Sequence, residues 1–154
     1  MNDFDKLLQS AGEWIGRYRV QTSPAEPAEE SPSRLTVMPI LKGNFLRLDQ
    51  EWSWKGEPQS GCLLIGYFPE KQLATIHWMD PWHNGRGTMP LTGQFDPAGK
   101  LIAHGSFAVE GEPDWGWRIE IQGGDELTLN MFCVNPASGK DEGGVWSSFS
   151  RANG

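Results

Sequence analysis

Apolar and polar residues alternate along most of the chain with a period of two, which is typical of strands that bury one face. In the segment 13–21, Trp14, Tyr18 and Val20 alternate with Arg17 and Arg19, and the segments 44–54 and 115–122 repeat the pattern. Clusters of Gly, Pro, Asn and Asp separate the runs and indicate turns. We predict ten strands, over residues 13–21, 34–41, 44–54, 61–68, 72–79, 87–95, 101–110, 115–122, 126–134 and 145–151.

Two segments depart from this period. Within residues 1–11, Phe4, Leu7 and Leu8 follow a helical spacing and Gly12 comes next, so we predict a short helix over residues 3–11. Residues 22–33 are rich in Pro, Glu and Ser. We expect this segment to form a mobile flap loop.

The order of the elements predicts the topology. No long crossover separates any two strands, so an antiparallel up-and-down meander is the simplest arrangement. One apolar face on each strand then favours a closed all-β barrel, and we expect residues 1–154 to form a single domain. Segments 61–68 and 72–79 are apolar on both faces, which leaves their inward face undecided and favours a second subunit, in a homodimer.

In such a meander, successive loops alternate between the two ends of the barrel. The three longest, 22–33, 80–86 and 135–144, share one end, which we call the mouth; the opposite end, with the tighter turns, is the floor. Long loops carry function more often than tight turns do. The same alternation brings Trp14 and Arg151 together at the floor, where a cation–π contact would seal the barrel beneath the short helix.

Composition narrows the partners and the compartment. The chain carries 13 Lys and Arg against 20 Asp and Glu, a net charge of −7, which argues against nucleic acid and against an anionic membrane surface. The first ten residues lack the apolar region of a signal peptide, so we expect a cytoplasmic protein. Cys62 and Cys133 lie inside predicted strands and are expected to be small core residues.

Tryptophan and acidic residues gather at the predicted mouth, around the segment 77–83. Rigid apolar walls with a few polar groups suit a small-molecule site. We therefore predict lipocalin-like binding of a small, largely apolar molecule inside the barrel, without a cofactor. The predicted ligand-binding residues are Gln50, Trp52, Trp54, His77, Trp82, His83, Trp115 and Trp117.

A second hypothesis is an enzyme, a hydrolase or an isomerase, at the same mouth. His77, Asp80 and His83 are residue types that ligate metals or transfer protons, although their spacing matches no strong metal signature. Nucleophilic catalysis has no support in the sequence, because neither cysteine lies in a loop beside a histidine and no Gly-x-Ser-x-Gly elbow exists.

The segment Gly12-Glu13-Trp14-Ile15-Gly16-Arg17-Tyr18 resembles the Gly-x-Trp start of calycin barrels, the group of lipocalins, fatty-acid-binding proteins and nitrobindins. A last-strand Arg, here Arg151, completes the pairing that this group shares. The run from Ile40 to Arg47, followed by Leu64-Ile65-Gly66-Tyr67, is similar to a bacterial family of small calycin-like barrels of unknown function. The resemblance implies a barrel with a cavity and no particular activity.

The chain also departs from two branches of that group. Nitrobindins bind haem through a histidine late in the chain, whereas segments 126–134 and 145–151 contain none, which leaves His77, His83 or His104 as haem ligands. Fatty-acid-binding proteins hold a carboxylate with an Arg and a Tyr on the last strand. Here that strand has only Arg151, at the floor, and three prolines in 22–33 exclude a helical lid.

Overall fold

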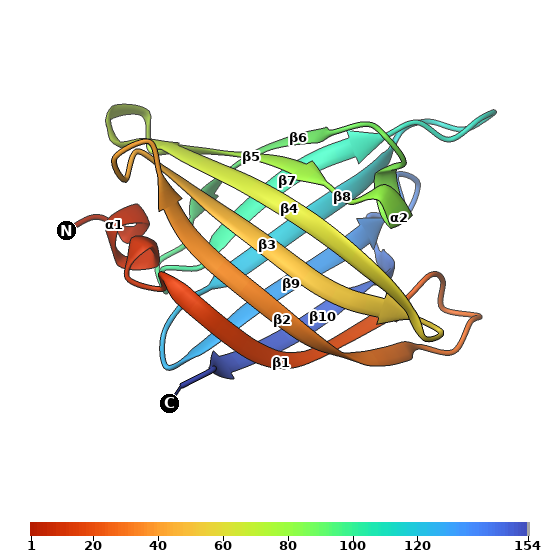
Figure 1. The fold of residues 1–154 in the computed structure, drawn as a ribbon. Coiled ribbons are helices and arrows are strands. Elements are labelled where there is room, and N and C mark those ends of the chain that lie inside the picture. Colours follow the sequence, from red (N-terminus) through yellow and green to blue (C-terminus); the bar gives the residue numbers. More distant parts are fainter. Residues whose placement is uncertain (154) are drawn as a thin grey trace.

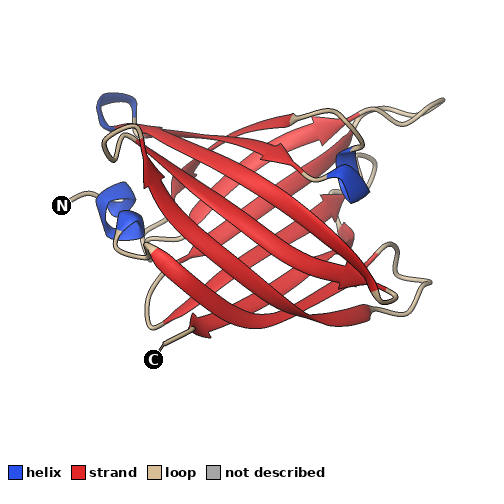
Figure 2. Cartoon of the chain, viewed as in Figure 1, coloured by secondary structure: helices blue, strands red, loops and turns tan. Residues whose placement is uncertain are grey.

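The computed structural model describes residues 1–153 and shows a closed barrel of ten antiparallel strands, each paired with the next along the chain, with β1 closing onto β10 (Figures 1 and 2). The predicted all-β fold with a short N-terminal helix is confirmed. The elements are α1 (Asp3–Leu8), β1 (Gly12–Gln21), β2 (Glu29–Ile40), β3 (Phe45–Trp54), β4 (Glu57–Phe68), the 3-10 turn η1 (Pro69–Lys71), β5 (Leu73–Met79), α2 (Pro81–Asn84), β6 (Met89–Phe95), β7 (Leu101–Phe107), β8 (Trp115–Gln122), β9 (Glu126–Val134) and β10 (Asp141–Arg151).

Several predicted boundaries were wrong. The predicted flap over 22–33 is a shorter loop, because β2 begins at Glu29, where it pairs with Val20 of β1. Ser31 and Ser33 in this part of β2 are buried. The sequence did not predict this, because a segment rich in polar residues is normally read as an exposed loop. Similarly, β10 begins at Asp141 and includes a β-bulge before Gly144, whereas α1 ends at Leu8 and β7 ends at Phe107.

The barrel interior holds the alternate residues of every strand. Leu35, Leu48, Ile65 and Ile119 belong to this core and are almost completely inaccessible to solvent. In β4 and β5, whose inward face the sequence left undecided, the residues that point inward are Leu63, Ile65, Ile76 and Trp78. His77 alternates with Ile76 and Trp78 and is therefore exposed on the outer surface.

The floor is closed by α1 and the two ends of the sheet, as Figure 1 shows. Trp14 and Arg151 are register partners of β1 and β10, and the Arg151 guanidinium lies 4.4 Å from the centre of the Trp14 ring. Arg151 also donates hydrogen bonds to the carbonyl oxygens of Ala11 (2.6 Å) and Gln9 (2.9 Å). Because these carbonyls follow α1, Arg151 ties the helix to the last strand.

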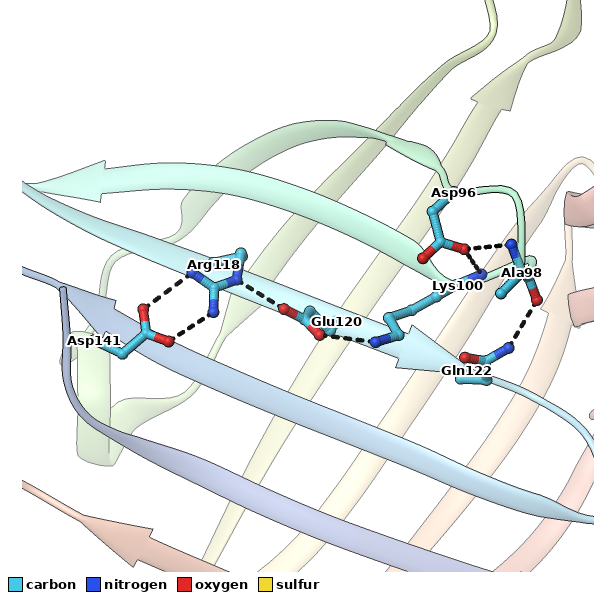
Figure 3. Close-up of polar contacts among 7 residues, drawn as sticks. All are labelled: Asp96, Ala98, Lys100, Arg118, Glu120, Gln122 and Asp141. Atoms are coloured by element: carbon cyan, nitrogen blue, oxygen red, sulfur yellow. Dashed lines mark hydrogen bonds and ion pairs between the residues drawn. The ribbon is translucent and has the colours of Figure 1, made fainter. Parts of the chain in front are cut away.

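A chain of polar contacts runs along β8 on the outer surface of the barrel (Figure 3). Arg118 on β8 donates to both carboxylate oxygens of Asp141, at 3.1 and 2.9 Å, and to Glu120 at 2.8 Å. Glu120 also accepts from Lys100 at 3.3 Å. The contacts between Arg118 and Asp141 tie the start of β10 to β8 across β9, near the mouth, where the bulge interrupts the regular pairing.

No helix within residues 1–153 is both long enough and apolar enough to cross a membrane.

Candidate functional site

The short helix α2 lies at the mouth, at the opposite end of the barrel from α1 (Figure 1). Asp80 caps its N-terminus by accepting hydrogen bonds from the backbone N–H groups of Trp82 (3.0 Å) and His83 (3.2 Å). Pro81 fits the first helical position, where no N–H donor is needed, and Gly85 ends the helix with a positive φ of 61°. The sequence Asp-Pro-Trp-His-Asn-Gly thus builds a lid between β5 and β6.

The lid packs on the mouth through Trp82 and His83. The Trp82 ring contacts Trp54 and Trp52 at centroid distances of 5.0 and 5.2 Å. The His83 ring lies among interior aromatic side chains, 5.1 Å from Trp78 and 5.7 Å from Trp117. Trp82 therefore anchors α2 to the end of β3, and His83 reaches inward.

His83 is held neutral by this environment. Burial lowers the pKa of His83 from 6.5 to about 3, and its Nε2 lies 3.2 Å from the Tyr18 hydroxyl, with which it forms a hydrogen bond. Tyr18 in turn stacks on Trp52 at 4.3 Å. Burial first, and then the charge of Asp80, raise the pKa of Tyr18 well above its usual value. Both groups are consequently uncharged near neutral pH.

Asp80 is the charged group that acts on Tyr18 in this cluster. Burial raises the pKa of Asp80 from 3.8 to about 6, against the opposing effect of the two backbone N–H groups that it accepts. The indole N–H of Trp52 acts in the same direction as these two groups, although it does not reach regular hydrogen-bond geometry. Asp80 is thus mostly ionised at neutral pH and gains protons in mild acid.

A pocket of about 330 Å³, which we call the mouth pocket, lies between α2 and strands β5 to β8. Its lining residues are Trp78, His83, Asn84, Met89, Phe107, Ala108 and Trp117. The volume is at the lower end of the range for small-molecule sites. Other hollows, such as the one beside α1 that Lys6 and Pro97 line, lie on the outside of the barrel.

The mouth pocket is lined mainly by apolar and aromatic residues, and two of its lining residues carry unsatisfied donors. Within residues 1–153, the buried indole Nε1 of Trp117 and the buried amide Nδ2 of Asn84 have no hydrogen-bond partner. The indole Nε1 atoms of Trp52 and Trp115, also near the mouth, are buried without a partner as well. None of the lining side chains carries a positive charge, because His83 is neutral.

The structure separates the predicted ligand-binding residues. His83 and Trp117 line the mouth pocket, whereas Trp52, Trp54, Trp82 and Trp115 are not among its lining residues. Gln50 is buried inside the barrel, where its amide donates a hydrogen bond to Ser147 Oγ at 3.2 Å. This bond joins β3 to β10 inside the barrel, and Gln50 does not line the mouth pocket.

The expected inward position of His77 was wrong, because the pleat of β5 turns Ile76 and Trp78 inward and leaves His77 exposed outside. His104, considered as a haem ligand, is also exposed on the outer face. His77, Asp80 and His83 therefore do not converge. In the described part of the chain, no group of three or more His, Cys, Asp or Glu side chains comes together as a metal site.

Several lining residues were missed by the sequence analysis. Trp78 was hidden by the undecided phase of segment 72–79, although Ile76 and Trp78 share the strand period opposite His77. Asn84 lies on α2, which the Asp80 cap, Pro81 and Gly85 could have indicated as a short helix. Met89 begins β6, whereas Phe107 ends β7 and Ala108 follows it, so the hairpin of these two strands brings the three residues to the mouth.

Comparison with known proteins adds a family and a fold. A family model described as "Protein of unknown function (DUF1579)" matches residues 3–151. The crystal structure of Rv2717c from M. tuberculosis is similar, with a TM-score of 0.66 and 16% sequence identity over 98% of each chain, and supports the fold alone. A protein of unknown function from the DUF3598 family of Nostoc punctiforme reaches a TM-score of 0.25 and 12% identity, over 99% of this chain and 100% of that one, and carries no argument. No curated protein matches the chain.

Proposed function

The chain belongs to the DUF1579 family of proteins of unknown function, and we propose from its site that it binds a small, largely apolar molecule in the mouth pocket. The observation that carries this proposal is the pocket itself. Aromatic side chains from β5, β7 and β8 meet the lid α2 around a concave volume whose lining residues are mainly apolar. Small-molecule sites typically combine such walls with a few polar groups, here His83 and Asn84.

The buried aromatic residues support a binding role at the mouth rather than deep in the barrel. Below the lid, the interior is occupied by large buried side chains such as Tyr18, Trp52 and Leu48. Tyr18 and Trp52 stack on one another directly beneath the His83 contact. We therefore propose that the ligand lies under α2, against Phe107 and the stacked pair of Trp78 and Trp117.

The alternative of a hydrolase or isomerase has less support. A general base works best when its pKa lies near the working pH. His83 has a pKa lowered to about 3, and Asp80 already accepts two backbone hydrogen bonds as the cap of α2. The geometry thus gives each group a structural task and favours binding.

Three further proposals concern the setting of this function. We propose that the barrel is a calycin, because Trp14 and Arg151 make the contact that the resemblance implies. We propose a homodimer, because Phe45 and Phe68 expose apolar surface on the outer face of neighbouring strands. A cytoplasmic location in a bacterium stays a proposal from the sequence.

The binding proposal is tested by titrating tryptophan fluorescence with fatty acids, retinoids, flavins, haem and small naphthalene derivatives. We expect a saturable change with at least one apolar compound. Ala108→Phe adds a ring to the lining of the pocket and is expected to weaken binding at least about tenfold. The matched control is Ala137→Phe, in the exposed β9–β10 loop, which should bind as the unmodified protein does. A lack of response to every compound, or unchanged binding by Ala108→Phe, would contradict the proposal.

A further inference from the structure

Unsatisfied N–H groups gather around the mouth. Burying a donor without an acceptor is unfavourable, and folded proteins keep few such groups. Trp117 is 8% exposed and Trp52 is 3% exposed, so water does not reach their indole nitrogens freely, and neither has a partner within residues 1–153. Trp117 and Asn84 both line the mouth pocket. Two of the four unsatisfied donors thus belong to the walls of the proposed site.

We propose that the mouth pocket binds an uncharged, planar aromatic molecule that carries a hydrogen-bond acceptor, such as an aryl ketone, and that Trp117 Nε1 and Asn84 Nδ2 donate to this acceptor. This inference rests on the proposed function and specifies its ligand class. An acceptor on the ligand would give the Trp117 and Asn84 donors the hydrogen-bond partner that the protein does not supply, which offsets the free-energy cost of burying them.

The shape of the walls favours a flat ligand. The rings of Trp78 and Trp117 stack on one another, with an interplanar angle of 9° and a centroid distance of 5.2 Å, so no ring fits between them and the pair forms one aromatic wall of the pocket. Phe107 packs edge-on against Trp117 at 6.4 Å. Rigid aromatic surfaces offer large contact areas to a planar ring and lose little conformational entropy when they bind it.

The charges at the mouth favour an uncharged acceptor. Asp80 is mostly ionised near neutral pH and the whole chain has a net charge of −7, so a carboxylate ligand would be repelled. None of the lining side chains supplies a compensating cation. A cationic ligand would instead leave the Trp117 and Asn84 donors without an acceptor.

The lid position of Asn84 makes the contact adjustable. Asn84 closes α2, its backbone N–H donates to the Asp80 carbonyl at 2.7 Å, and only four residues form the helix. A helix this short has few internal hydrogen bonds, and small shifts of its last residue are inexpensive. The Asn84 amide can therefore follow the acceptor while Trp117 is fixed on β8.

The test uses three naphthalenes of nearly equal size in isothermal titration calorimetry near neutral pH. 2-Acetylnaphthalene carries an uncharged acceptor, 2-isopropenylnaphthalene replaces the carbonyl with a hydrocarbon, and 2-naphthoate carries a charged acceptor. We expect the ketone to bind about tenfold more tightly than the hydrocarbon, and naphthoate more weakly than the ketone. Equal affinities of ketone and hydrocarbon, or tightest binding of naphthoate, would overturn the inference and leave the proposed function standing.

Variants locate the donors. Trp117→Phe keeps an aromatic wall and removes the indole N–H, so the ketone affinity should fall about tenfold towards that of the hydrocarbon, whose own affinity changes little. Trp146→Phe is the matched control, because Trp146 lies on the outer face against Arg19. Asn84→Leu provides a second test if Trp117→Phe does not fold. An undiminished ketone preference in both pocket variants overturns the assignment of the donors.

Absence of binding is also informative. If none of the three naphthalenes binds while another apolar compound changes the tryptophan fluorescence, the inference fails and the proposed function holds. If no compound in either experiment binds, both fail.

Discussion

At Gly16, the backbones of β1 and β10 approach so closely that a side chain has no room. A Cβ atom added there would lie 1.8 Å from the carbonyl oxygen of Ser148 and 2.9 Å from the Cα atom of Phe149. The second glycine of the Gly-x-Trp-x-Gly pattern, Gly16, is thus required because any side chain there would collide with the backbone of β10. This close approach allows Trp14, two residues earlier, to lie flat beneath Arg151 at the floor.

We predict that Gly16→Ala destabilises the protein by about 3 kcal/mol or more, because one backbone must move to admit the methyl group. The measurement is the free energy of unfolding in urea. Gly87→Ala is the matched control: its added Cβ would come no closer than 3.5 Å to any neighbour, so the change should stay within about 0.5 kcal/mol. Similar values for the two variants would mean that the strands can separate at no cost.

At the scale of the element, α2 depends on one buried carboxylate. Asp80 supplies the cap that begins the helix, and its side chain is only 4% exposed. Its pKa of about 6 exceeds the value of 3.8 for the unfolded chain, so the folded protein binds the proton more tightly. The stabilisation from this proton is complete below about pH 3.8 and is lost as the pH rises through about 6.

We predict that Asp80→Asn removes this pH dependence while keeping an acceptor at the cap. The shift corresponds to an order of magnitude of about 3 kcal/mol, so the variant should gain up to that amount relative to the unmodified protein between about pH 4 and pH 8. The check is urea unfolding of both proteins across this range. Asp80→Ala should show the same relative trend but be about 1 kcal/mol less stable, because it loses the cap. A difference that does not vary with pH would contradict the raised pKa.

At the scale of the whole molecule, the two ends of the barrel differ in construction. The floor is sealed by Trp14, Arg151 and α1, whereas the mouth has the lid α2 and the pocket below it. The outer surface of the barrel also carries exposed apolar side chains on one side. Met38, Leu41, Phe45 and Phe68 expose 42%, 68%, 40% and 52% of their surfaces on β2 to β4 and the turn between β2 and β3.

Because these apolar residues lie on neighbouring strands and on the turn between two of them, we predict that they form the interface of the proposed homodimer. Light scattering coupled to gel filtration should give twice the mass of 17.2 kDa for the unmodified chain. The double variant Phe45→Ser with Phe68→Ser should give a monomer. Ile15→Ser, a control on the outer face of β1, should leave the mass unchanged. A monomeric unmodified protein would rule out the homodimer.

Local patterns in the sequence were sufficient for the elements and their order. Strict alternation in β1, β3 and β8 predicted which residues face inward, because a strand with one face in solvent carries its polar residues on that face. The count of ten strands and the closure by neighbouring pairs followed from the short connections. The meeting of Trp14 with Arg151 followed from the same alternation of ends.

The tertiary structure decided what the sequence left open. Strands β4 and β5 carry apolar residues on both faces, so the few polar residues of β5, Thr75 and His77, did not settle its outer side. The inward position of Trp78 and the outward position of His77 came from pairing with the neighbouring strands. The mouth pocket joins residues of β5, α2, β6, β7 and β8 across long sequence separations. Period and turn chemistry are local properties of a chain, whereas a cavity depends on how side chains from several elements are placed relative to one another in three dimensions.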